Sequence, residues 1–148
     1  MRTLRELTAR DSRRGEAGAL RQTVTRFLYA WYRMAELEEP AFSIVVARLD
    51  GRTVLELAGE LDLATAPELE DALHERLRAG EPLVVDLRGL DFMDSSGVRA
   101  LVAGHSAAKD AGCSLVIVRA EHGTEVDRVI DVSGIAGALG MVDEPPAE

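Results

Sequence analysis

The sequence has little of several features that define other classes of protein. It contains one cysteine in 148 residues, Cys113, which cannot close an intramolecular disulfide. Aromatic residues make up only 4% of the chain, and no stretch approaches the ~20 consecutive apolar residues of a membrane helix. The first residues carry no recognisable secretory signal. We therefore expect a soluble protein in a reducing, cytoplasmic environment.

Basic residues are also scarce: the chain has 17 Lys and Arg and 26 Asp and Glu, which gives a net charge of -9. The chain lacks the basic surface that neutralises phosphates, so we expect no direct nucleic-acid partner. The charge is uneven: residues 1–33 hold eight arginines against three acidic residues, and residues 34–148 hold nine basic against 23 acidic ones. With 47% apolar residues, the chain has enough material for one hydrophobic core.

The charge break and Pro40 divide the chain into a basic extension, residues 1–40, and a domain, residues 41–148. Apolar residues at three- and four-residue steps predict an amphipathic helix over about 16–38, with the stripe Leu20, Val24, Phe27, Leu28 and Trp31. This helix is expected to dock on the core, to form a homodimer, or to bind another protein or an anionic surface. Met34 precedes a sequence typical of a natural start, so we also hypothesise that translation begins there.

From Ala41 onward, short apolar runs alternate with turn signals. Two strands, Ile44–Ala47 and Thr53–Ala58, are joined by Asp50-Gly51, a hairpin signal. Thr65 and Glu68 form a predicted capping box for a helix over 66–79. A continuous apolar run from Leu83 to Leu87 predicts a strand buried on both faces, followed by a loop over Arg88–Asp94.

The rest of the chain repeats this alternation. A second helix is predicted with Val98, Leu101, Val102 and Ala108 facing inward, then a strand at Leu115–Val118. Thr124 caps a third helix, which Gly134 ends. Alternating strands and helices predict an α/β fold, a mixed β-sheet of about four to five strands with helices packed against it.

One segment, Asp91–Gly97, places two hydroxyls beside two carboxylates where a buried strand leads into a helix. The simplest interpretation is that Asp94 or Ser95 caps the helix. Two adjacent serines followed by Gly97 exceed what a cap requires, and the first turn of a helix favours negative charge. A modifiable or partner-facing hydroxyl is the alternative.

Three motifs resemble the anti-sigma factor antagonists of the STAS domain family. They are Gly59-Glu60-Leu61-Asp62, Val85-Asp86-Leu87 with Phe92-Met93-Asp94-Ser95-Ser96-Gly97, and Val129-Ile130-Asp131-Val132-Ser133-Gly134, and their order and spacing agree over about residues 42–142. The resemblance implies a STAS-like fold and a regulatory binding protein rather than an enzyme.

The resemblance also implies a mechanism. Ser95 would be phosphorylated by an anti-sigma factor that is itself a serine kinase, and a PP2C-type phosphatase would reverse this. The unphosphorylated protein would bind the kinase and free the sigma factor. Partner contacts would come from Asp62, Asp94, Ser95, Ser96 and Gly97. Such a protein needs no cofactor of its own, and its Cys and His residues lack the spacing of metal ligands.

Two other functions compete with this one. A hydrolase with Ser95 or Ser96 as nucleophile lacks the Gly-x-Ser-x-Gly pattern, because residue 93 is Met, and His105 is expected to be buried. A constitutive STAS adaptor in a transporter or stress-signalling complex would keep the fold without phosphorylation. The sequence after Val142 leaves no room for the last helix common in the family, which predicts an uncovered apolar flank of the sheet.

Overall fold

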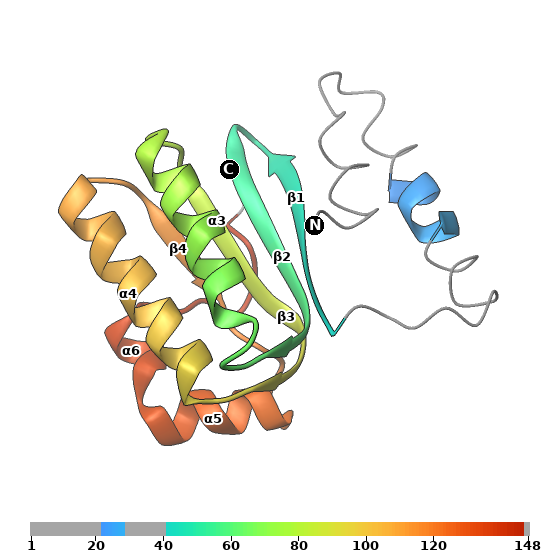
Figure 1. The fold of residues 1–148 in the computed structure, drawn as a ribbon, viewed down its shortest axis with the longest axis vertical. Coiled ribbons are helices and arrows are strands. Elements are labelled where there is room, and N and C mark those ends of the chain that lie inside the picture. The colour runs from blue at the N-terminus through green and yellow to red at the C-terminus, as the bar shows by residue number, and fades with distance from the viewer. Residues whose placement is uncertain (1–21, 29–40, 147–148) are drawn as a thin grey trace.

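The computed structural model describes residues 22–28 and 41–146, and the helices and strands of the domain all lie in the second range. Four strands form one sheet in the order β1-β2-β3-β4 (Figure 1). They are β1 (Phe42–Leu49), β2 (Arg52–Leu61), β3 (Leu83–Met93) and β4 (Leu115–Val118). β1 and β2 are antiparallel, whereas β2 with β3 and β3 with β4 are parallel. The predicted mixed sheet with packed helices is confirmed.

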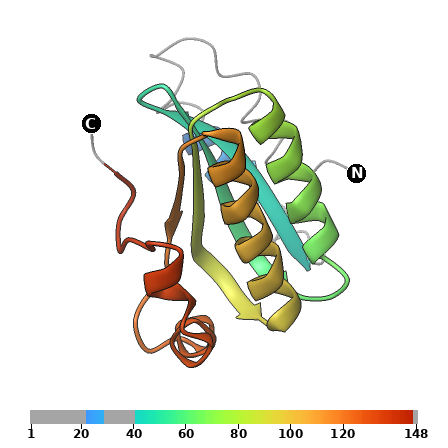
Figure 2. The same ribbon diagram turned by 90° about the vertical axis from the view of Figure 1, so that its left-hand side faces the viewer.

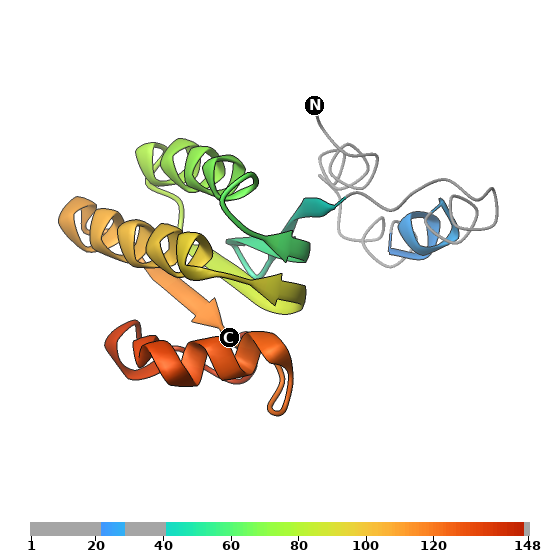
Figure 3. The same cartoon turned by 60° about the horizontal axis from the view of Figure 1, so that its bottom comes forward.

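Four helices lie in the described range 41–146. Helices α3 (Ala66–Arg78) and α4 (Ser95–Ala111) lie side by side against one face of the sheet (Figure 2). Helices α5 (Glu125–Ser133) and α6 (Ile135–Ala138) lie on the other side of β4 (Figure 3). Among the described residues, no helix is long and apolar enough to cross a membrane.

Local sequence signals explain several of these elements. Asp50 and Gly51 both have positive φ, 50° and 78°, as the hairpin signal predicted. Gly112 and Gly134 end α4 and α5 in the left-handed conformation. The Thr124 hydroxyl accepts a hydrogen bond from the Asp127 N–H at 3.1 Å, so the predicted cap of the third helix is confirmed.

The predicted loop over Arg88–Asp94 is wrong, because β3 continues to Met93. The far half of β2 pairs with this segment, from Ala58 opposite Gly89 to Leu61 opposite Met93. Two irregularities in the ladder, around Leu57 and between Gly59 and Glu60, interrupt the regular pattern. A strand that depends on a partner 30 residues away gives a weak local signal.

Three predictions on the helices are also wrong. Thr65 makes no side-chain cap hydrogen bond to α3, because its hydroxyl is engaged by the loop before the helix, where it accepts from the Asp62 N–H at 2.9 Å. Val102, placed on the inner stripe of α4, is 39% exposed, and His105, expected to be buried, is half-buried. Ala100 and Gly104 face the core instead, and Ala108 is buried as predicted.

The apolar flank is not uncovered as predicted. On the sheet face away from α3 and α4, Val54, Val84 and Val118 are at most 5% exposed. Val142 pairs with the end of β4, accepting from the Arg119 N–H at 2.9 Å and donating to the Ile117 carbonyl at 3.0 Å. The chain around Val142 therefore protects the free edge of β4, a role the sequence pattern did not suggest.

Most of the predicted N-terminal helix lies outside the described residues, as does Met34. Residues 22–28 are helical. Two members of the predicted apolar stripe, Val24 and Phe27, are 42% and 68% exposed. The structure therefore shows no docking of these two side chains on the core, and the division of the chain at residue 40 stays a prediction.

Candidate functional site

The end of β2 and the end of β3 bring the two predicted site segments together. Leu61 and Met93 are paired in parallel register, so Asp62 and Asp94 follow neighbouring strands at the same end of the sheet. The Asp94 N–H donates to the Leu61 carbonyl at 3.2 Å, which ties the two segments directly. The loop after β2 and the start of α4 therefore form one surface, at the lower end of the sheet in Figure 1.

Asp94 is the N-cap of α4, as the simpler interpretation of this segment predicted. Its Oδ1 accepts from the backbone N–H of Ser96 at 2.8 Å and of Gly97 at 3.3 Å. Two of the backbone N–H groups that lack an acceptor within the helix are thereby hydrogen-bonded. The carboxylate of Asp94 is committed to the helix, and its half-buried position reflects that.

Ser95 is the first residue of α4 and is exposed. Within the part of the chain that the structure describes, its hydroxyl has no hydrogen-bond partner. Ser96 is half-buried. The cap is therefore provided by Asp94, which leaves the Ser95 hydroxyl at the surface without a structural task.

Gly97 faces the interior rather than the solvent. A Cβ there would lie 2.6 Å from Met93 Cγ and 2.9 Å from Leu61 Cγ, both in buried side chains. The sequence analysis explained this glycine as leaving the serines unshielded, but a side chain here would point into the core. Its physical role is to let α4 approach the strand ends closely, and its predicted part in partner binding stays a prediction.

Asp62 organises the loop before α3. Its Oδ1 accepts from the backbone N–H groups of Ala64 at 3.0 Å and Thr65 at 3.1 Å, and its carbonyl accepts from Ala66 at 2.8 Å. The hydroxyl of Thr65 donates to the Glu60 carbonyl at 2.8 Å. These bonds hold the loop in one conformation beside the start of α4.

Exposed apolar side chains border this surface, and the sequence analysis did not single them out as contacts. Leu63, in the loop fixed by Asp62, is 76% exposed, and Phe92, near the end of β3, is 40% exposed. Asp91 is exposed beside Phe92. The site is thus a surface with apolar and acidic groups around one free hydroxyl, which suits binding to another protein better than binding a small substrate.

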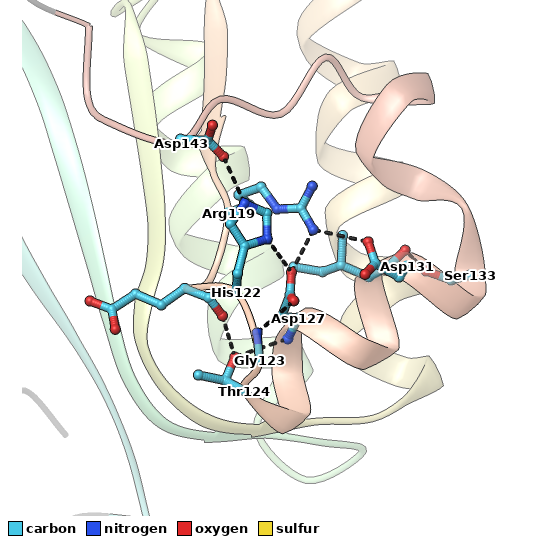
Figure 4. A network of polar contacts seen from close by, with 10 residues as sticks. Arg119, His122, Gly123, Thr124, Asp127, Asp131, Ser133 and Asp143 are labelled. Atoms are coloured by element: carbon cyan, nitrogen blue, oxygen red, sulfur yellow. Dashed lines mark hydrogen bonds and ion pairs between the residues drawn. The ribbon is translucent and has the colours of Figure 1, made fainter.

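A second polar cluster fixes the loop between β4 and α5 (Figure 4). The Arg119 guanidinium donates to Asp127 and, at 3.0 Å, to Asp131. The Gly123 N–H donates to Asp127 Oδ2 at 2.9 Å, and this bond together with Arg119 lowers the pKa of Asp127. The two carboxylates raise the pKa of Arg119. Sequence reasoning missed Arg119, because its partners lie eight and twelve residues away.

The three histidines of the described residues lie on α4, on α3 and in the loop before α5. His105 lies ten residues after Ser95 on the same helix, roughly 15 Å along its axis. His122 contacts Asp127 and Asp143, with N to O distances of 3.6 and 3.8 Å, and His74 is exposed on α3. Among the described residues, no group of three His, Cys, Asp or Glu side chains is placed to hold a metal ion.

Comparison with known proteins places this geometry in a family. A family model described as "Mlab, STAS domain" matches residues 44–143. RsfB, the anti-sigma-F factor antagonist of Mycobacterium tuberculosis, is 40% identical over 65 residues, which cover 43% of this chain and 52% of RsfB. The chain thus spans about half the length of this curated relative.

Solved structures share the fold. The crystal structure of an anti-sigma factor antagonist from Mycobacterium paratuberculosis has a TM-score of 0.62 and 28% identity, covering 73% of this chain and 92% of that one. The phosphorylated form of the Bacillus cell fate determinant SpoIIAA shares the fold with a TM-score of 0.53 at 20% identity, covering 70% of this chain and 92% of that one. The family model covers 44–143, well over half of the chain, and the chain therefore belongs to the STAS domain family.

Proposed function

We propose that this protein is an anti-sigma factor antagonist controlled by phosphorylation of Ser95. In the unphosphorylated state it binds an anti-sigma factor that is a serine kinase, and the sigma factor is released. The exposed hydroxyl of Ser95, without a partner at the first residue of α4 and beside the Asp62 loop, carries this proposal. The similarity to anti-sigma factor antagonists supports it.

The proposed switch is a phosphoryl transfer. The Ser95 oxygen attacks the γ-phosphorus of kinase-bound ATP, the bond between that phosphorus and the β–γ bridging oxygen breaks, the serine proton passes to a base of the kinase, and ADP leaves. The protein gains about -1.5 to -2 charges and three acceptor oxygens. A PP2C-type phosphatase would reverse the change by hydrolysis.

The structure gives a physical reason why the phosphate would release the partner. The new charge would stand next to Asp94 and beside the loop of Asp62, which the hydrogen bond from the Asp94 N–H to the Leu61 carbonyl holds close. A docked protein would have to desolvate it there. Leu63 and Phe92 beside it are the apolar contacts that such a partner would bury. The helix start is already capped by Asp94, so the fold does not depend on the Ser95 hydroxyl.

The test is a titration of candidate anti-sigma kinases against the unmodified protein and Ser95→Asp. We expect Ser95→Asp to weaken binding about 5- to 150-fold, the usual range of coupling between sites. Ser106→Asp, on an exposed position of the same helix, is the matched control and should bind as the wild type does. Equal affinities of the Ser95→Asp variant and the wild type would refute the switch.

A second experiment separates the switch from a constitutive adaptor. The protein is incubated with a binding kinase and ATP, and its peptides are analysed by mass spectrometry. We expect phosphate on Ser95 and none in the Ser95→Ala variant. Binding without any phosphate at Ser95, in this assay and in protein isolated from its host, would instead identify an adaptor.

A further inference from the structure

One cation lies on α4 next to the proposed phosphorylation site. Arg99 follows Ser95 by four residues in the same helix, and both residues are exposed. Residues four apart on a helix are neighbours on its surface, with about 5 to 6 Å between their Cβ atoms. Within the described part of the chain, Arg99 has no ion pair or hydrogen bond. Its guanidinium is therefore available to a group on Ser95.

The backbone at the start of α4 has fewer free N–H donors for a phosphate on Ser95 than a helix start usually has. The N–H groups of Ser96 and Gly97 already donate to Asp94 Oδ1, and the N–H of Val98 donates to the Asp94 carbonyl at 3.1 Å. A phosphate would have to displace a carboxylate to use the first two. The nearby side chains of Asp62, Asp91 and Asp94 are acidic and offer no donor while ionised.

We infer that Arg99 is the counter-ion of phosphorylated Ser95, holding the phosphate along the outer face of α4 while Asp94 keeps the helix cap. The inference rests on the proposed function, since it assigns a residue to the phosphorylated state of the same site. The guanidinium would donate charge-assisted hydrogen bonds to the phosphoryl oxygens. Arg99 is a positioning residue for the modification and has no part in the transfer itself.

Pairing with Arg99 should shift the second pKa of the phosphate in a direction that can be measured. A phosphoserine has a second pKa of about 6. The carboxylates of Asp62, Asp91 and Asp94 favour its monoanion and raise that pKa, whereas Arg99 favours the dianion and lowers it. Removing the guanidinium should therefore raise the second pKa of the phosphate. High salt should suppress the effect, because both groups are exposed.

The experiment uses full-length protein carrying phosphoserine at position 95, inserted during translation so that no kinase is needed. Phosphorus NMR titration then compares the wild type with Arg99→Gln, Arg99→Lys and Arg78→Gln. We expect Arg99→Gln to raise the second pKa by about 0.3 units, the size expected for a surface pair four residues apart. Arg99→Lys should keep part of the effect. Arg78→Gln, at the far end of α3, should keep the wild-type value, and ~1 M salt should remove the difference.

Equal second pKa values in the wild type and Arg99→Gln would overturn the inference, as would the same shift in Arg78→Gln. The variant Asp94→Ala gives an independent readout. Because Asp94 is inferred to keep the helix cap, its removal should lower the free energy of unfolding equally in the phosphorylated and unphosphorylated proteins, and a smaller loss in the phosphorylated protein would show that the phosphate had taken over the cap. If no kinase phosphorylates Ser95, the proposed function is refuted, but the titration results stand because the phosphoserine is inserted without a kinase.

Discussion

The inward direction of Gly97 makes a testable prediction about the packing of the candidate site. In the variant Gly97→Ala, the new Cβ would lie 2.6 Å from Met93 Cγ and 2.9 Å from Leu61 Cγ, where ordinary contact begins at 3.4 Å. Leu61 is 0% and Met93 2% exposed, so neither side chain has free space to move into. The start of α4 would have to shift outward, or both side chains would have to repack.

The size of the effect follows from two opposing contributions. Adding a methyl group to a packed core costs about 1 to 3 kcal/mol. Replacing a helical glycine by alanine returns about 0.5 to 1 kcal/mol. The difference spans about 0 to 2.5 kcal/mol, and we expect Gly97→Ala to lower the free energy of unfolding by about 1 kcal/mol. The same shift would move Ser95 relative to the Asp62 loop and weaken binding of the proposed kinase.

Urea denaturation followed by far-UV circular dichroism measures the effect. The single tryptophan, Trp31, lies outside the described residues, so circular dichroism is preferred to fluorescence. Gly137→Ala is the matched control, since no heavy atom lies within 4 Å of its Cβ position, and it should leave stability unchanged or raise it. If Gly97→Ala were as stable as Gly137→Ala, the packing argument would be refuted.

Two further predictions concern carboxylates. Asp94→Ala should destabilise the protein by about 0.5 to 2 kcal/mol through loss of the helix cap, whereas Asp94→Asn should stay near the wild type; equal urea midpoints for both variants would argue against capping. The Gly123 N–H and Arg119 lower the pKa of Asp127. This shift stabilises the folded protein above the ordinary Asp pKa of about 3.9, and the stabilisation is lost as the pH falls through the lowered pKa. Asp127→Asn should therefore be less stable than the wild type at neutral pH, and the difference in stability should shrink as the pH falls through the lowered pKa of Asp127; a difference independent of pH would contradict this.

The elements that the sequence predicted well are those with a complete local signal. Asp50-Gly51 has the two positive φ angles of its turn, and Thr124 and Gly134 bound α5 within one residue of the prediction. Each of these preferences is decided by backbone conformation over a few neighbouring residues. The motif around Ser95 is local too, which is why its position at a strand-to-helix junction could be predicted.

The failures have two different causes. The spacing of Thr65 to Glu68 fits a capping box, but Asp62, three residues before Thr65, competes locally for the same hydroxyl. Two local patterns therefore overlap at Thr65, and spacing does not decide between them. Arg88–Asp94 has the local signal of a loop, because only pairing with β2 extends β3 to Met93, and that partner is distant along the sequence.

By itself, the sequence determined the order of strands and helices, several turn and cap positions, and the serine motif at the start of a helix. These features follow from short-range backbone preferences and apolar periodicity. The tertiary structure alone decided that Asp94, rather than a serine, takes the cap, that Gly97 faces the core, and that the Asp62 loop lies beside Ser95. These outcomes depend on β2 and β3 ending together in parallel register, a pairing between residues about thirty positions apart that only the folded sheet creates.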